Sequence, residues 1–150
     1  MVRSSASSCL VDNAHVVDVR APGRLATGTS GRSLLIVDDE FGLADATADL
    51  LAEAGYDVAL ALNGKLGLAN LAARPADLVL TDLMMPVMDG AEMIRRMRAD
   101  PALAHIPAIL MTALAEALPV GAEALHDAVL LKPFSVAELL AAVHRLLPPE

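Results

Sequence analysis

The sequence predicts one α/β domain with a doubly wound sheet of five parallel strands, and three observations support this fold class. Short, continuous apolar runs alternate five times with stretches whose apolar residues recur at helical spacing, beginning at Ser33. Strands that are apolar throughout are typical of parallel sheets covered by helices on both faces. The length of 150 residues suits a single domain, and with 55% hydrophobic but only 2% aromatic residues its core must be largely aliphatic.

Residues 1–32 differ in composition from the rest, and we expect a flexible N-terminal extension there, with the folded domain at residues 33–148. This extension is rich in serine at its start and in glycine, serine and threonine before Arg32. Within it, residues 16–19 form a short, mostly apolar run. That run could instead be an extra edge strand, because such short runs are ambiguous.

The first strand is expected at residues 34–37. A helix over residues 41–54 follows, because the apolar positions repeat there at helical spacing, and Gly55 ends it as a C-cap. The second strand is expected at residues 58–62, and the side chain of Asn63 is expected to cap the helix that comes next.

This second helix should stop at Arg74-Pro75, because the residue before a proline disfavours helical backbone angles. The third strand is expected at residues 78–81. A helix over residues 90–99 follows it and ends at Asp100-Pro101. The fourth strand is expected at residues 106–111.

The segment after the fourth strand is not expected to hold a regular helix. Pro119 and Gly121 would break or kink one, so a fourth helix within residues 113–125 should be short, irregular or mobile. The fifth strand is expected at residues 129–131, and Ser135 should cap a last helix. The buried stripe of that helix is expected at positions 136, 139, 140, 143 and 147.

The composition also argues against several functions. A net charge of −8 without a Lys or Arg cluster does not suit a nucleic-acid surface, so we expect protein partners. No apolar stretch reaches the roughly 18 residues that a membrane span needs, and the start of the chain does not resemble a signal peptide. The single cysteine, Cys9, excludes an intrachain disulfide and fits a reducing cytoplasm, where we expect the protein.

Five polar residues follow the expected strands at their carboxyl ends. Asp38 and Asp39 come after the first strand, and the third, fourth and fifth strands lead into Asp82, Thr112 and Lys132. These ends meet at one edge of a parallel sheet, where open α/β folds bind ligands. Taken singly, the residues could be helix caps or a surface charge, but capping does not require this set at successive strand ends. Three carboxylates, a hydroxyl and an ammonium suit a magnesium ion and a phosphoryl group on an aspartate.

In sequence order, the strings VDDE, TDLMMPVMDG, MTA and LKPF resemble the receiver domain of bacterial two-component response regulators of the stand-alone type. The resemblance implies a flavodoxin-like sheet with strand order 2-1-3-4-5. It implies that Asp82 is the phosphoacceptor and that Thr112, followed by the small Ala113, is the switch residue. Lys132 would pair with one phosphoryl oxygen, and its bond to Pro133 would be cis. The Thr112 hydroxyl and the Ala113 N–H would serve other phosphoryl oxygens.

The resemblance also implies a magnesium cofactor. A carboxylate is a weak nucleophile, so Asp82 can attack phosphorus only if a cation neutralises the charge on both reactants. Asp39 and Asp82 would bind the ion directly, and Asp38 would hold a metal-bound water. The backbone carbonyl of Met84 would add a neutral ligand.

The expected function is a phosphoryl-accepting switch rather than an enzyme: the phosphohistidine of a sensor histidine kinase donates, Asp82 accepts, and a changed surface engages a partner. The chain could also pass the phosphoryl group to a histidine phosphotransfer protein, act on an effector, or serve as a phosphate sink. Two alternatives remain open. One is a pseudo-receiver that works without phosphate. The other is a phosphatase of the haloacid dehalogenase type, which would need a second aspartate where Met84 stands.

Departures from the usual receiver pattern shape the expected output. Val129 stands where receivers usually have an aromatic residue, so switching by movement of an aromatic ring is in doubt.

Little charge lies in residues 113–125 or on the last helix, and we expect a homodimer through these elements and the strand at residues 129–131. The last helix is expected to expose Ala137, Ala141 and Ala142. The chain ends within a few residues of this helix, which fits a stand-alone receiver or a part of a longer protein.

Overall fold

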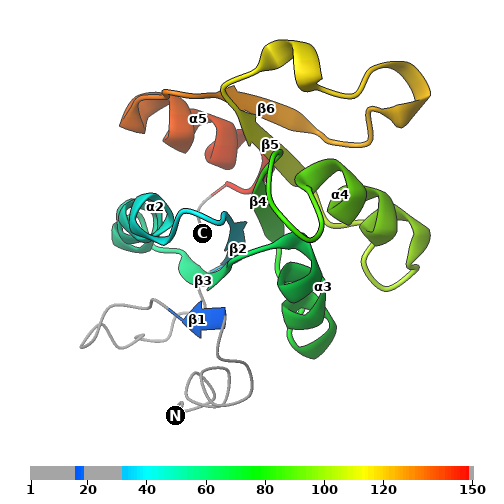
Figure 1. Ribbon diagram of the computed structural model, residues 1–150. Helices are drawn as coiled ribbons and strands as arrows, with labels where there is room; N and C mark the ends of the chain where they lie inside the picture. Colours follow the sequence, from blue (N-terminus) through cyan, green and yellow to red (C-terminus); the bar gives the residue numbers. More distant parts are fainter. Residues whose placement is uncertain (1–15, 19–31, 149–150) are drawn as a thin grey trace.

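The computed structural model describes residues 16–18 and 32–148, and Figure 1 shows one sheet with helices packed on both faces. The strands are β1 (Val16–Asp18), β2 (Ser33–Val37), β3 (Asp57–Ala61), β4 (Leu78–Asp82), β5 (Ala108–Thr112) and β6 (Ala128–Leu131). The α-helices are α2 (Phe41–Glu53), α3 (Gly64–Ala73), α4 (Gly90–Ala99) and α5 (Val136–Leu146). The strands lie in the order β1-β3-β2-β4-β5-β6, and β2 to β6 are parallel. If β2 is counted as the first strand, the five parallel strands have the predicted order 2-1-3-4-5.

The sheet has a sixth strand that the fold prediction did not include. Strand β1 pairs antiparallel with the outer edge of β3, with Val16 opposite Ala61 and Asp18 opposite Ala59. Of the two interpretations of residues 16–19, the structure therefore has the edge strand. The remaining parts of the predicted flexible extension, residues 1–15 and 19–31, lie outside the described residues.

Two aliphatic clusters form the core, one on each face of the sheet. Successive residues of β2 alternate between them: Leu34 and Ile36 face α2 and α5, whereas Leu35 and Val37 face α3 and α4. Both faces of the central strands are thus buried, which explains why the parallel strands read as continuous apolar runs. At roughly 25 cal/mol per Å² of apolar area removed from water, these clusters are the main source of the stability of the fold.

The helices begin and end where the polar residues of the sequence indicate. The side chains of Asn63 and Asp89 accept hydrogen bonds from backbone N–H groups in the first turns of α3 and α4. Ser135 and Glu138 form a complete capping box at the start of α5. After α2, Gly55 has a φ of 105°, the left-handed conformation that ends a helix and favours glycine.

The buried stripe of α5 is shorter than predicted. Leu139, Val143 and Leu147 are buried and Leu140 is half-buried, but Val136 is 48% exposed. Val136 lies at the first position of the helix, immediately after the turn that follows β6. The prediction for Val136 was wrong because helical spacing says nothing about where the neighbouring helix α2 stops covering the surface.

Two short 3-10 turns, Ala115–Ala117 and Gly121–Glu123, replace a fourth regular helix, as the proline and glycine of this segment led us to expect. Only Leu118 and Leu125 of the segment pack against the core. Its far end is held by Arg98 of α4. The Arg98 guanidinium donates to the carbonyl oxygen of Leu125 at 3.2 Å and pairs with a carboxylate oxygen of Asp127 at 2.9 Å. The segment is therefore held at its two ends and by Leu118 near its middle, and the rest of it is largely exposed.

Candidate functional site

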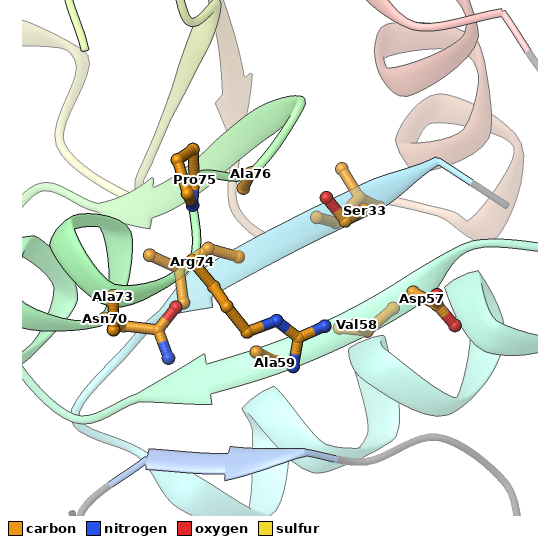
Figure 2. Close-up of a pocket in the computed structure, with 11 residues that line it drawn as sticks. Ser33, Asp57, Val58, Ala59, Asn70, Ala73, Arg74, Pro75 and Ala76 are labelled. Carbon is orange, nitrogen blue, oxygen red and sulfur yellow. The ribbon is translucent and has the colours of Figure 1, made fainter. Parts of the chain in front are cut away.

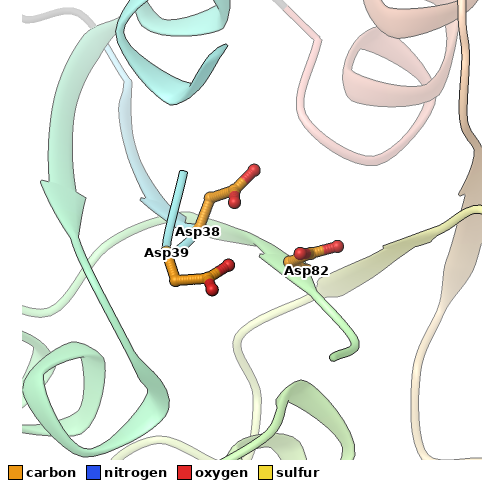
Figure 3. A group of neighbouring side chains, drawn as sticks. All are labelled: Asp38, Asp39 and Asp82. Carbon is orange, nitrogen blue, oxygen red and sulfur yellow. The ribbon is translucent and has the colours of Figure 1, made fainter. Parts of the chain in front are cut away.

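The carboxyl ends of the parallel strands bring the five predicted polar residues to one edge of the sheet. Asp38 and Asp39 directly follow β2, Asp82 is the last residue of β4, Thr112 the last of β5, and Lys132 directly follows β6. Figure 3 shows the three aspartates converging on one space, and one carboxylate oxygen from each lies within 4.8 Å of the others. The prediction that the three aspartates gather at one site is confirmed.

Lys132 supplies the positive charge of the site. Its ammonium lies 3.2 Å from Asp82 Oδ1 and 3.6 Å from Asp38 Oδ2. Its backbone N–H donates to the carbonyl oxygen of Thr112 at 2.9 Å, which joins the ends of β5 and β6. The bond between Lys132 and Pro133 is cis, as the sequence resemblance implied.

The charges of the site are not balanced. Burial raises the pKa of Asp82, the neighbouring Asp38 and Asp39 carboxylates raise it further, and Lys132 opposes them without cancelling the increase. Burial acts to lower the pKa of Lys132, but the carboxylates of Asp38 and Asp82 raise it above its ordinary value. A cluster of three carboxylates with one ammonium favours a further cation. Hard oxygen ligands of this kind are those that Mg²⁺ takes, so the donor set fits that ion.

Asp38 does not cap the helix that follows it. Its Oδ1 accepts the N–H of Glu40 at 2.9 Å, and Glu40 is the N-cap residue of α2, which has no side-chain cap of its own. Asp38 is only 3% exposed, and its own N–H donates to the carbonyl oxygen of Ala61. Its second carboxylate oxygen therefore stays directed to Lys132, whereas Asp39 is exposed beside it. The capping interpretation that the sequence allowed for this pair does not apply.

Thr112 is 2% exposed, and its side-chain oxygen accepts the N–H of Leu114 at 3.0 Å. A threonine hydroxyl has one proton to donate in addition to the bonds that it accepts. Thr112 can therefore keep this bond while it donates to another oxygen. Through the same bond the site is linked to the irregular segment. Val129 is half-buried in β6, opposite Leu110 in the sheet register.

Sequence reasoning treated Gly90 only as the start of a helix, but the structure gives it a second role. A Cβ atom on Gly90 would lie 2.2 Å from the backbone carbonyl oxygen of Asp82, a distance that no side chain can occupy. The N–H of Gly90 also donates to the carbonyl oxygen of Leu83 at 2.9 Å. The start of α4 thus packs directly against the end of β4. The signal for this was the glycine itself, since close backbone approach is one reason for a glycine in such a motif.

Residues 83–89 connect Asp82 to α4 and carry two exposed apolar side chains, Met84 at 57% and Val87 at 76% exposure. Val87 has a φ of 70°, which is unusual for a β-branched residue. No sequence signal indicated this conformation. The role of the Met84 carbonyl as a metal ligand stays a prediction.

Comparison with known proteins agrees with this geometry. The model of the response regulator receiver domain matches residues 34–144. The chain belongs to the receiver domain family. Receiver domains are signalling modules that bind Mg²⁺ at an acidic pocket, and this receiver has a cluster of three aspartates at the edge of its sheet.

Relatives of this receiver include the DNA-binding dual master transcriptional regulator RpaA of Synechocystis sp., which is 39% identical over 116 residues. That match covers 76% of this chain and 48% of RpaA, so the chain spans about half the length of the curated relatives it matches.

Among solved structures, a putative response regulator from Chloroflexus aurantiacus superposes with a TM-score of 0.72 at 31% identity, covering 77% of this chain and 96% of that one. The receiver domain of the sensor histidine kinase PA1611 from Pseudomonas aeruginosa has a TM-score of 0.69 at 28% identity, covering 78% and 98%. That structure is described with a magnesium ion coordinated in its active-site cleft.

Two hollows of this receiver differ in their relation to the site. One, of about 210 Å³, lies between β2, β3 and the end of α3, and Figure 2 shows the Arg74 side chain extending across β3 there. Its lining includes Ser33 and Asp57, the first residues of their strands, so it lies at the other end of the sheet from Asp82.

The second hollow, of about 450 Å³, adjoins the site. It is a mostly apolar groove between α2 and the turn after β6, and Ala113 and Lys132 form part of its wall. Sequence reasoning missed this groove because it forms only where α2 and the start of α5 approach each other.

Within residues 16–18 and 32–148, no helix has the length and apolar character needed to cross a bilayer.

Proposed function

We propose that this receiver is a phosphoryl-accepting switch that takes a phosphoryl group from the phosphohistidine of a sensor histidine kinase onto Asp82. The observation that carries the proposal is the Asp82 side chain, which is 13% exposed, faces the Lys132 ammonium at 3.2 Å and shares its space with two further carboxylates. A lone structural aspartate would not need this arrangement. Asp38, Asp39 and Asp82 would hold Mg²⁺, with the Met84 carbonyl as a further ligand.

In the transfer, a carboxylate oxygen of Asp82 forms a bond to phosphorus as the bond between phosphorus and the imidazole nitrogen breaks, and the electron pair leaves with the imidazole. The bound cation would lower the repulsion between the anionic carboxylate and the phosphoryl oxygens. Lys132 would balance charge on one phosphoryl oxygen, since its ammonium already points at the nucleophile. Thr112 would donate its hydroxyl proton to another, and the N–H of Ala113 would assist.

The apolar groove beside the site suits the phosphodonor. Leu43 and Leu50 of α2 line one wall, and Pro133 and Val136 line the other. Leu43 is 49% and Val136 48% exposed, so a large apolar surface meets solvent at the mouth of the site. A partner helix lying in this groove would bring a histidine on its surface toward Asp82. We assign the groove to the kinase helix that carries the phosphohistidine.

The output would leave through the irregular segment, which the Thr112 side chain contacts through Leu114. We propose that phosphorylation orders this segment and that it forms, with β6 and α5, the face of a homodimer or the docking surface of an effector. Transfer onward to a histidine phosphotransfer protein would use the same aspartyl phosphate. We place the protein in the cytoplasm, where sensor kinases phosphorylate such partners.

The experiment that tests the proposal is intact-mass spectrometry after treatment with acetyl phosphate and magnesium. The wild type should gain the mass of one phosphoryl group, and Asp82→Asn should gain none. Equal labelling of the two proteins would show that the nucleophile is another residue. An unlabelled wild type that still binds its partner would favour the pseudo-receiver instead.

A further inference from the structure

The loop between β4 and α4 is fixed at its ends and at one point between them. At its ends, the backbone of Leu83 is hydrogen-bonded to β5 and to Gly90. In the part of the chain that the structure describes, residues 84–88 receive one hydrogen bond from another element. It comes from Gly64, whose N–H donates to the carbonyl oxygen of Met88 at 3.1 Å. This bond ties the middle of the loop to the first residue of α3.

Gly64 is buried and leaves no room for a side chain. A Cβ atom at this position would lie 2.8 Å from the carbonyl oxygen of Met88 and 2.9 Å from its Cγ atom. The first of these contacts is with backbone, so the loop itself would have to move. As the first residue of α3, Gly64 has an N–H that finds no acceptor within the helix. The loop supplies that acceptor, and the absence of a side chain permits the close approach.

The tie from Gly64 acts on a turn that has little freedom to absorb a displacement. The N–H of Met88 donates to the carbonyl oxygen of Pro86 at 2.7 Å, and Val87 between them has a φ of 70°. A β-branched residue keeps such a conformation only where its surroundings hold it. Met84 lies two residues before Pro86, so a shift of Met88 reaches it through this turn.

We infer that Gly64 is a positioning residue for the magnesium site: its bond to Met88 holds the loop where the Met84 carbonyl can join the three aspartates. The inference rests on the proposed function, which assigns the Met84 carbonyl to Mg²⁺. The coupling must run in both directions. If the bond from Gly64 favours metal binding, bound metal must favour the bond.

Two buried glycines of α3 provide a matched pair of variants. A Cβ atom on Gly67 would lie 2.9 Å from the Cε atom of Met93 and 3.1 Å from Cγ2 of Val37, so it meets the core and not the loop. The Met93 Cε atom ends a flexible side chain and can move aside. In calorimetric titrations we expect Gly64→Ala to bind Mg²⁺ at least about tenfold more weakly than the wild type, and Gly67→Ala to stay within about twofold of it.

Labelling by acetyl phosphate separates a positioning role from general damage to the site. For Gly64→Ala, the Mg²⁺ concentration that gives half-maximal labelling should rise by the same factor as the dissociation constant. The rate at saturating Mg²⁺ should stay near that of the wild type, because the substitution does not touch Asp82 or Lys132. A lower saturated rate with an unchanged dependence on Mg²⁺ would show a structural defect and overturn the inference.

The wild type offers a test that needs no variant. Hydrogen exchange of the Gly64 amide, followed by NMR, should slow at least about tenfold on saturation with Mg²⁺, because the metal holds its acceptor in place. The Gly67 amide donates to the carbonyl oxygen of Asn63 at 2.9 Å and should respond much less. Equal slowing of the two amides, or no slowing at Gly64, would overturn the inference even if Gly64→Ala fails to fold.

The outcomes also distinguish this inference from the proposed function. A wild type that binds no Mg²⁺ and gains no phosphoryl group would overturn the proposed function, and the inference would fall with it. If the wild type binds Mg²⁺ and is labelled, but Gly64→Ala and Gly67→Ala have equal affinity for the ion, the positioning role alone is wrong.

Discussion

The ammonium of Lys132 lies 3.2 Å from a carboxylate oxygen of Asp82, and yet the pKa of Asp82 stays above its ordinary value. Burial and the charge of Asp38 together outweigh the one favourable contact. In the absence of a further cation, the folded protein therefore holds the Asp82 carboxylate in an unfavourable charged state. The same imbalance makes the site receptive to a divalent ion.

The first prediction concerns stability. Because the folded-state pKa of Asp82 is raised, stability is lost as pH rises from the unfolded value through the folded value, and the loss is complete above both. In urea with a chelator at neutral pH, Asp82→Asn should therefore be more stable than the wild type. The difference should shrink below the ordinary pKa of an aspartate. Mg²⁺ should raise the urea midpoint of the wild type more than that of the variant. If Asp82→Asn is less stable than the wild type, the attraction between Lys132 and Asp82 outweighs burial and the repulsion from the neighbouring carboxylates.

The second prediction tests the contact between the start of α4 and the end of β4. Gly90→Ala would place a Cβ atom against the carbonyl oxygen of Asp82, so the strand end must move. We expect a loss of about 1 to 3 kcal/mol in urea unfolding and slower labelling by acetyl phosphate. Gly42→Ala in α2 is the matched control, because a Cβ atom there meets nothing within 4 Å. It should leave labelling unchanged and not destabilise the protein.

The third prediction separates docking from chemistry. Leu43→Glu places a charge in the apolar groove without touching Asp82 or its neighbours. Labelling by acetyl phosphate should stay at the wild-type rate, while transfer from a sensor kinase that labels the wild type should fall at least tenfold. Val120→Glu, at a position 77% exposed on the irregular segment, should not affect kinase transfer. If Leu43→Glu slows labelling by acetyl phosphate as much as transfer from the kinase, the groove influences the chemistry at Asp82 and not the docking of the kinase.

The fourth prediction concerns the segment that replaces a fourth helix. Its middle has few packing contacts, so residues 113–125 should exchange amide hydrogens fastest within the folded domain, and phosphorylation should slow them. Arg98→Ala removes the anchor at the far end and should speed this exchange before phosphorylation. Arg95→Ala, one turn earlier on the exposed side of α4, should not. If residues 113–125 exchange slowly and phosphorylation does not change their rate, the output must leave through another part of the receiver.

A valine at position 129 should also affect how strongly residues 113–125 respond to phosphorylation. Without an aromatic ring at this position, the two states of the switch differ by less buried apolar area, on the order of 1 kcal/mol. Val129→Tyr should leave labelling by acetyl phosphate intact and change the protection of residues 113–125. Unchanged protection would show that this position does not contribute to the switch.

The parallel strands and the acidic site could be predicted because both depend on local pattern. Continuous apolar runs mark strands buried on two faces, and a polar residue after such a run must lie at the sheet edge, as Asp82 and Lys132 do. Strand β1 could not be predicted in this way, since a run of three residues is too short to show the alternation of a strand. The exposure of Val136, the conformation of Val87 and the groove between α2 and α5 depend on how separate elements approach each other, which the pattern of one element does not record.

Strand β1 has a consequence for how large an assembly of this protein can grow. Unpaired strand edges invite addition of further chains, and a sheet with two open edges can extend into a fibre. Here β1 pairs with residues 59–61 of β3, whereas β6 ends the sheet on the other side. A strand of three residues offers few unpaired backbone groups, so the sheet edge on this side gives little purchase to a further chain. The short antiparallel strand would then act as a terminator that favours pairs over polymers, and deleting residues 1–31 should convert defined dimers into larger species.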